Sequence, residues 1–145
     1  MIKTDLIAAL VEKIQGHTAR VGVVGLGYVG LPFLVEKAKV GFHVTGIDRS
    51  SERAGMVARG ENYIGDVRDE DLRAVVDAGL VETTTAFDVV SQLDVIVICV
   101  PTPLDRNLTP DLSYVRSVTR EIAACLRPGQ LISLESTTYP GTTCL

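Results

Sequence analysis

The sequence predicts an α/β domain in which a mostly parallel sheet is covered by helices on both faces. Short apolar segments rich in β-branched residues alternate with longer segments whose apolar residues recur every three to four positions. That alternation is typical of strands followed by helices. Two of the strand-like segments, at 20–26 and 94–100, are strongly apolar, and the one at 20–26 is expected to be buried on both faces.

The composition is that of a globular protein and excludes several functional classes. The chain has 145 residues, 46% of them hydrophobic and 22% charged, which fits one ordinary domain. A net charge of −4, without any run of Lys and Arg, argues against nucleic acid or an anionic membrane as a partner. No apolar run approaches the ~20 residues that span a bilayer, and the charged N-terminal stretch is unlike a signal peptide. Three cysteines without metal-ligand spacing favour a reducing, cytoplasmic compartment and no metal site.

The first half of the chain predicts five elements in order. Residues 4–15 form an amphipathic helix whose apolar stripe is Leu6, Leu10, Val11 and Ile14. We expect this stripe to pack on the domain, and the alternative is packing on another protomer. The others are a strand at 20–26, a helix at 28–41, a strand at 43–48 and a helix at 50–59. Gly41 suits the C-terminal cap of the 28–41 helix, and Ser50 or Ser51 suits the N-cap of the 50–59 helix.

The second half continues the alternation. It predicts a helix at 68–79, a strand at 80–85, one or two helical turns at 86–92 and a strand at 94–100. Residues 101–112 hold three prolines and are expected to form a loop. A helix at 113–129 and a strand at 130–136 follow, and the apolar face of that helix is expected to be Val115, Val118, Ile122, Ala123 and Leu126. Cys99 and Cys125 are expected to be small core residues.

The turn after the first strand carries the motif G-x-G-x-x-G, formed by Gly25, Gly27 and Gly30. In a dinucleotide-binding turn, the first glycine allows the tight bend, the second lets a pyrophosphate approach the backbone, and the third lets helix and strand pack closely. Asp48 ends the second strand, where a carboxylate would accept hydrogen bonds from the adenosine ribose. This order predicts a Rossmann-type doubly wound fold, and the alternative is a ligand-free glycine turn with a capping aspartate.

Asp48 favours NAD over NADP, because it would repel a 2′-phosphate. Arg49 and Arg53 leave the NADP alternative open, since a nearby arginine can accommodate that phosphate. We expect residues 1–19 to form the N-terminal helix and linker, and residues 20–145 to form the dinucleotide-binding domain.

Five segments resemble the UDP-glucose/GDP-mannose dehydrogenase family: GLGYVGLP at 25–32, GFHVTGID at 41–48, VPTPLD at 100–105, PDLSYV at 110–115 and ESTTYPGTT at 135–143. The last segment looks most like the branch that oxidises UDP-N-acetylglucosamine or UDP-N-acetylmannosamine. The resemblance implies an NAD-dependent enzyme that oxidises the C6 alcohol of a UDP-sugar to a carboxylate with two NAD+. It also implies a homo-oligomer.

The resemblance assigns roles to residues of this chain. Those it places at the cofactor are Gly25, Gly27, Tyr28, Val29, Gly30, Asp48, Arg53, Val100, Pro101 and Thr102. Thr137 matches the threonine near the reacting C6, where it helps to hold a water and borders the cofactor. Glu135 is a candidate general base or, equally, a solvated loop carboxylate. For residues 100–102, the alternative to a cofactor contact is a rigid connector. For Thr137, the alternative is a hydroxyl that only bonds to the backbone.

The family's catalytic cysteine, lysine and aspartate, its central helix and its sugar-nucleotide domain have no counterpart in these 145 residues. Cys144 lacks the surrounding motif, and we expect it to be structural or incidental. The chain is therefore expected to bind NAD without turnover. Two alternatives are a stand-alone NAD(H) sensor and the cofactor domain of a β-hydroxyacid-type dehydrogenase. Tyr114 and Tyr139 are expected to be ordinary, partly buried tyrosines, and the alternative is that they contact a ligand.

Overall fold

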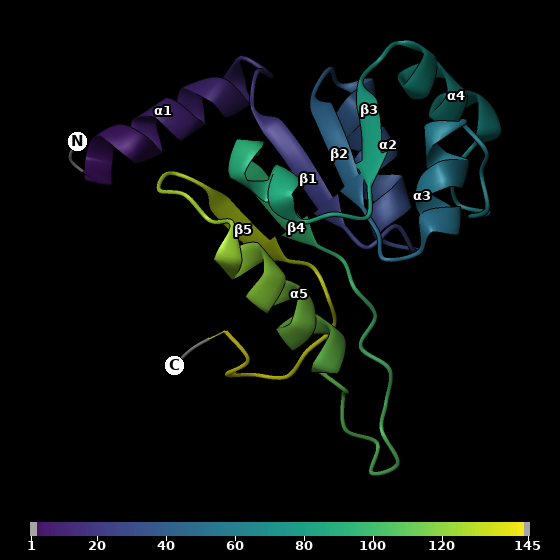
Figure 1. Ribbon diagram of the computed structural model, residues 1–145, viewed down its shortest axis with the longest axis vertical. Coiled ribbons are helices and arrows are strands. Elements are labelled where there is room, and N and C mark those ends of the chain that lie inside the picture. Colours follow the sequence, from purple (N-terminus) through teal and green to yellow (C-terminus); the bar gives the residue numbers. More distant parts are fainter. Residues whose placement is uncertain (1–2, 144–145) are drawn as a thin grey trace.

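The computed structural model describes residues 3–143 and contains one five-stranded sheet with helices on both faces (Figure 1). The elements in chain order are α1 (Lys3–Gln15), β1 (Arg20–Val24), α2 (Gly30–Lys39), β2 (His43–Ile47), α3 (Ser51–Ala58), α4 (Asp69–Asp77), β3 (Val81–Thr84), the 3₁₀ helix η1 (Asp88–Gln92), β4 (Val95–Ile98), α5 (Ser113–Ala124) and β5 (Leu131–Leu134). Cys144 lies outside the described residues. The predicted fold class is confirmed.

The sheet has the strand order β3-β2-β1-β4-β5, and all four pairings are parallel. Val21 of β1 lies opposite Val44 of β2 on one side and Val95 of β4 on the other. The chain builds outward from β1 in one direction and then, from β4, in the other. The carboxyl ends of β1 and β4 are therefore the point where the topology switches, which in open α/β sheets is where ligands bind.

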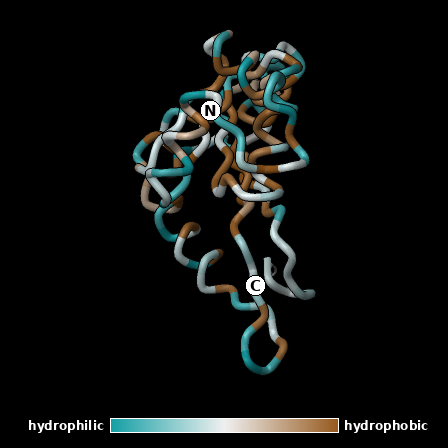
Figure 2. The backbone as a smooth tube through the Cα atoms, turned by 90° about the vertical axis from the view of Figure 1, so that its right-hand side faces the viewer, coloured by the Kyte–Doolittle hydropathy of each residue, from teal (hydrophilic) through white to brown (hydrophobic). Residues whose placement is uncertain are grey.

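Alternating side chains of the strands enter two separate cores. On one face, Val21 and Val23 pack with Leu31 and Leu34 of α2 and with apolar residues of α3 and α4. On the other face, the core is formed by Val24, Ile96 and Ile98 of the strands with Val90 of η1 and Val115, Val118 and Ile122 of α5. Figure 2 shows the hydrophobic stretches running through the middle of the strand layer. Coverage of both faces explains why the central strands β1 and β4 lack polar alternation, whereas the edge strands β3 and β5 carry polar residues and are partly exposed.

Two predicted helix ends are confirmed. The Ser50 side chain accepts a hydrogen bond from the backbone N–H of Arg53 at 3.2 Å, as an N-cap does. At the end of α2, Gly41 has φ of +102°, its N–H bonds to the Ala38 carbonyl, and Phe42 N–H bonds to the Lys37 carbonyl. This pair of bonds is a Schellman motif, which requires the left-handed conformation that glycine adopts at no steric cost.

The predicted apolar face of α5 is wrong at its last two members. Ala123 lies within α5 but is turned away from the stripe of buried Val115, Val118 and Ile122, and it is exposed. Leu126 is exposed because the helix ends at Ala124, before this residue. Arg127 then folds back, donating hydrogen bonds to the carbonyls of Ser91 and Leu93 at 2.8 and 2.7 Å, and this turn takes Leu126 away from the helix face. Half-buried Cys125 packs against the core in their place.

Helix α1 lies beside the amino-terminal end of the sheet and is only partly covered. The Leu6 side chain packs near Gly129, and Leu10 and Ile14 are half-buried. Val11 is 44% exposed, so its predicted place in the core is wrong. The helix therefore contacts the domain through Leu6, Leu10 and Ile14, and the Val11 side of the stripe faces solvent. Within residues 3–143, no helix is both long and apolar enough to cross a membrane.

A buried carboxylate fixes the end of α1. Asp94 accepts hydrogen bonds from Lys13 Nζ at 2.7 Å, from Arg127 Nη2 at 3.1 Å and from the backbone N–H of Arg20 at 2.9 Å. Burial by itself would raise the pKa of Asp94, but these hydrogen bonds outweigh it and hold the pKa below its ordinary value. Asp94 thus ties together α1, β1 and the turn before β5.

Candidate dinucleotide-binding site

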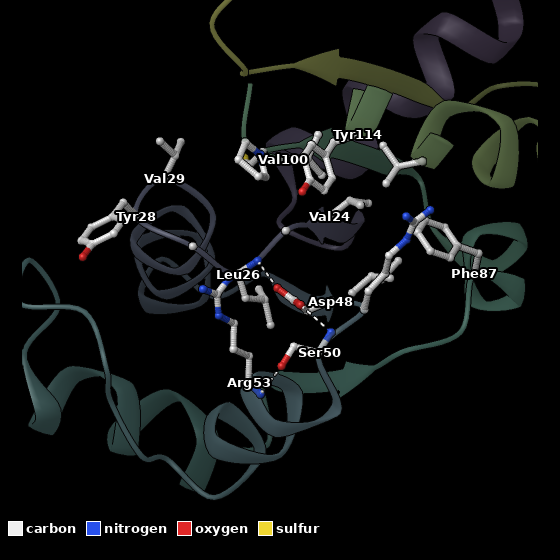
Figure 3. A pocket seen from close by; sticks show the side chains of 17 residues that line it. Val24, Leu26, Tyr28, Val29, Asp48, Ser50, Arg53, Phe87, Val100 and Tyr114 are labelled. Carbon is white, nitrogen blue, oxygen red and sulfur yellow. Dashed lines mark hydrogen bonds between the residues drawn. The ribbon is translucent and has the colours of Figure 1, made fainter. Parts of the chain in front are cut away.

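A cavity of about 500 Å³ opens at the carboxyl ends of β1, β2 and β4, where the topology switches. Figure 3 shows its lining: Tyr28 and Val29 lie on one side of this view, Phe87 lies on the other, and Asp48 lies between them. The β1–α2 turn, the β2–α3 turn and the chain after β4 all contribute residues. A concave, largely apolar site with a few polar groups is typical of a small-molecule or cofactor site.

The three glycines of the motif have three different geometries. Gly25 has φ of +94°, and a Cβ there would lie 2.8 Å from the Cys99 carbonyl oxygen. A Cβ on Gly30 would lie 1.6 Å from the Gly25 carbonyl oxygen, so only glycine lets α2 start this close to β1. A Cβ on Gly27 would meet nothing within 4 Å. Glycine is therefore required by the fold at Gly25 and Gly30, whereas Gly27 faces open space beside the cavity.

The start of α2 presents unpaired donors to that space. Within residues 3–143, no hydrogen bond uses the backbone N–H of Gly27, Tyr28 or Val29. The N-cap Val29 has no capping side chain, and the first turn of α2 holds no acidic residue. Free N–H groups and the positive end of the helix dipole attract anions. This turn fits a pyrophosphate, since its Gly27 position is open and its donors have no partner among residues 3–143.

Asp48 is buried at the end of β2, and two backbone donors fix its carboxylate. Oδ2 accepts from Leu26 N–H at 2.9 Å, and Oδ1 accepts from Ser50 N–H at 2.8 Å (Figure 3). Asp48 therefore joins the glycine turn to the start of α3. Each carboxylate oxygen carries more than one acceptor site, so both remain able to accept hydroxyl groups of a ribose.

Tyr63 holds the glycine turn in place through a hydrogen bond to its backbone. Its hydroxyl donates to the Leu26 carbonyl at 2.6 Å, and the Arg53 guanidinium carbon lies 5.9 Å from the centre of its ring. Burial, together with the negative charge of Asp48, raises the pKa of Tyr63 to about 12, although Arg53 acts in the opposite direction. Tyr63 therefore stays a neutral donor and holds the turn in place at physiological pH.

The opposite end of the cavity is apolar and was not predicted as a site. Its walls are Ile47, Phe87, Val118 and Tyr114. Phe87 comes from the residue before η1 and Val118 from α5, so these residues are distant from the glycine motif in sequence. Tyr114 is 46% exposed and lines the cavity, a position that suits the alternative of a contact with a ligand.

Eight of the residues predicted at the cofactor line the cavity: Gly25, Gly27, Tyr28, Val29, Asp48, Arg53, Val100 and Pro101. Gly30 lies beneath the turn as a packing position. Thr102 is half-buried and does not belong to the lining.

Glu135 and Thr137 are exposed and lie outside the lining, but their segment is attached to it. The Ser136 hydroxyl between them donates to the Val100 carbonyl at 2.7 Å, and the Glu135 carboxylate accepts from Ser133 Oγ at 2.7 Å. Burial, reinforced by the negative charge of Glu135, raises the pKa of the Cys99 thiol in the cavity wall to about 11. The 135–137 segment is thus attached to the cavity wall at Val100.

Comparison with known proteins agrees with this site. Residues 19–144 match the UDP-glucose/GDP-mannose dehydrogenase family, NAD binding domain. The chain is 37% identical over 125 residues to the UDP-N-acetyl-D-mannosamine dehydrogenase of Pyrococcus horikoshii, covering 86% of the chain and 30% of that protein. It is 34% identical over 128 residues to the UDP-N-acetyl-D-glucosamine 6-dehydrogenase of Pseudomonas aeruginosa, covering 86% of the chain and 28% of that protein.

A solved structure shows the same arrangement. The crystal structure of NDP-N-acetyl-D-galactosaminuronic acid dehydrogenase from Methanosarcina mazei superposes with a TM-score of 0.83 at 33% identity, covering 97% of this chain and 31% of that one. The chain thus spans about 30% of the length of the relatives it matches. The match decides against a β-hydroxyacid-type dehydrogenase domain. The chain belongs to the UDP-glucose/GDP-mannose dehydrogenase family, of which it forms the NAD-binding domain.

Proposed function

We propose that this domain serves an enzyme that oxidises the C6 alcohol of a UDP-N-acetylhexosamine to a carboxylate with two NAD+. The relatives that support this substrate class are named for UDP-N-acetylmannosamine and UDP-N-acetylglucosamine. The single observation that carries the cofactor assignment is the open Gly27 position, which lies next to unpaired N–H groups and a buried Asp48. Such a site accepts a pyrophosphate and a ribose diol together.

In this proposal, the pyrophosphate binds the Gly25–Gly30 turn and the adenosine ribose binds Asp48. The adenine occupies the apolar end beside Phe87 and Val118, which supplies the flat, dry surface that a purine requires. The remaining end, toward Pro101, is left for the nicotinamide half.

When bound, NAD+ accepts a hydride from the C6 carbon of the sugar. This chain contributes orientation and exclusion of water. Val100 and Pro101 form an apolar wall after β4, and Ser136 fastens the 135–137 segment to that wall. We propose that Thr137 holds a water near C6 and that Glu135 is positioned to accept a proton. Both roles require the sugar-binding part of the enzyme.

Binding of NADH to the chain tests the cofactor assignment. We expect one NADH per chain, and we expect Asp48→Ala to weaken it by about 10- to 100-fold, since charge-assisted hydrogen bonds to the ribose are lost. Asp66→Ala, which removes an exposed carboxylate outside the cavity, is the matched control. The assignment fails if the folded wild-type chain does not bind NADH, or if both variants bind alike.

Turnover separates the enzyme domain from the alternative of an NAD(H) sensor. We expect no NADH formation when the chain is mixed with NAD+ and UDP-N-acetylhexosamines, because the family's cysteine and lysine have no counterpart here. A measurable rate with the purified chain would contradict this expectation. A partner protein whose affinity for the chain depends on NAD(H) would favour the sensor.

Three further assignments complete the proposal. Residues 1–19 act as the N-terminal helix and linker, and residues 20–145 as the dinucleotide-binding domain. The enzyme is a homo-oligomer and is located in the cytoplasm. The exposed apolar side chains of α1, Ile7 and Val11, are consistent with a contact to another protomer.

A further inference from the structure

An ion pair crosses the edge of the cavity between two distant parts of the chain. Arg49 directly follows Asp48 and belongs to the cavity lining. Its Nη2 donates to the Ser117 hydroxyl and to Oε1 of Glu121, both on α5. The three residues thus connect the β2–α3 turn to the opposite wall. Glu121 itself is not among the residues that line the cavity, and its direct contact with the lining is with Arg49.

The surroundings of Asp48 contain most of what a 2′-phosphate would require. Two arginines, Arg49 and Arg53, line the cavity, and the Ser50 N–H at the start of α3 points at the carboxylate. A phosphate monoester carries nearly two negative charges, and guanidinium groups bind it with paired hydrogen bonds. A carboxylate at Asp48 opposes this phosphate directly. Glu121 opposes it by a second route, since its carboxylate already pairs with Nη2 of the Arg49 guanidinium and neutralises part of the charge that a phosphate would seek.

We propose that Glu121 is a second determinant of the preference for NAD+ over NADP+, acting by engaging the Arg49 guanidinium that a 2′-phosphate would otherwise recruit. Glu121 is thus a positioning residue, and Asp48 is the residue that meets the ribose. The inference rests on the proposed dinucleotide site. It adds a residue 73 positions from Asp48, on another element, to the set that selects the cofactor.

Arg53 is the competing source of a phosphate contact. Its guanidinium lies over the Tyr63 ring, and among the described residues no carboxylate is within ion-pair distance of it. Arg53 is therefore equally accessible whether or not Glu121 is charged. Removal of the Glu121 charge should therefore raise the affinity for NADP+ through Arg49 and not through Arg53.

The size of the effect follows from the exposure of the pair. The side chains of Arg49 and Glu121 are 49% and 46% exposed, so solvent weakens their attraction. We therefore expect Glu121→Gln to lower the ratio of the NADPH to the NADH dissociation constant by about two- to fivefold. The effect is measured in an Asp48→Asn background, where the direct repulsion of the phosphate is gone.

The experiment uses the 145-residue chain and the fluorescence of the reduced cofactors, which is read against a protein without tryptophan. NADH and NADPH are titrated into the wild type, Asp48→Asn, and Asp48→Asn with Glu121→Gln. A matched control combines Asp48→Asn with Glu12→Gln, which removes the same charge from exposed α1 at the other end of the sheet. We expect only Glu121→Gln to lower the ratio, and we expect Glu121→Asp to restore most of the discrimination.

Two arginine variants decide the route. Arg49→Ala, added to the Asp48→Asn/Glu121→Gln chain, should abolish the gain in NADPH affinity. In an Arg53→Ala background, Glu121→Gln should still lower the ratio of the NADPH to the NADH dissociation constant. The inference is overturned if Glu12→Gln changes the ratio as much as Glu121→Gln does, or if the gain persists without Arg49. Failure of the wild type to bind NADH would instead refute the proposed dinucleotide site.

Discussion

Gly27→Ala separates the fold from cofactor binding better than other changes in this chain. Gly27 does not have a positive φ, and a Cβ there meets no atom within 4 Å. The free energy of unfolding should stay unchanged or rise by up to about 1 kcal/mol, as for glycines replaced at compatible positions. The new methyl would project into the space proposed for the pyrophosphate. Loss of one charge-assisted N–H bond to phosphate weakens binding by at least about tenfold, or about 1.4 kcal/mol.

Gly30→Ala is the opposite case and serves as the comparison. Its Cβ would lie 1.6 Å from the Gly25 carbonyl oxygen, a backbone atom that no rotamer change can move. We expect a loss of about 3 kcal/mol in the free energy of unfolding, the upper end of overpacking costs. Urea denaturation followed by circular dichroism gives both stabilities, and NADH titration gives both affinities. The reasoning is refuted if Gly27→Ala binds NADH as the wild type does, or is as unstable as Gly30→Ala.

Three other predictions concern parts of the chain outside the glycine turn. Because the pKa of Asp94 is held below its ordinary value of about 4, its contacts stabilise the fold above that pH and are lost as the pH falls. Asp94→Asn should therefore have a lower free energy of unfolding than the wild type at neutral pH, and it should lose less of that free energy between about pH 6 and pH 3. Denaturation curves of both chains at several pH values measure this difference. Since burial raises the pKa of the Cys99 thiol to about 11, iodoacetamide at neutral pH should modify half-buried Cys125 before Cys99, as read by peptide mass spectrometry; equal rates would contradict the burial. The exposed Ile7 and Val11 should promote self-association, so light scattering at high concentration should show larger species that are reduced when both are replaced by serine; a monodisperse wild-type monomer would count against this.

Local chemistry made much of the fold predictable. The cap at Ser50, the left-handed end at Gly41 and the acid at the end of β2 each depend on a few neighbouring residues. The G-x-G-x-x-G turn depends on sterics that only glycine satisfies at Gly25 and Gly30. Such features follow from residue type and spacing, without knowledge of the tertiary structure.

The remaining features depend on where the chain turns back on itself. Periodicity predicted Leu126 on the buried face of α5, but the helix ends at Ala124 and Arg127 holds the following turn by its hydrogen bond to the Leu93 carbonyl. Phe87 entered no prediction of the site, because a short 3₁₀ segment carries no periodic pattern. The contact between Arg49 and Glu121 joins residues 72 positions apart, and nothing in their local sequence pairs them.

Amide chemical shifts of the ¹⁵N-labelled chain, recorded during a titration with NAD+, test the central claim most directly. The account predicts saturable shifts that are largest at the amides of residues 26–29 and of Ser50, where backbone donors border the cavity. Asp48→Ala should move the midpoint of these shifts to an NAD+ concentration that is about 10- to 100-fold higher. Shifts centred on β5 or on the 101–112 loop, or none at millimolar NAD+ in a folded chain, would contradict the assignment of this cavity to the dinucleotide.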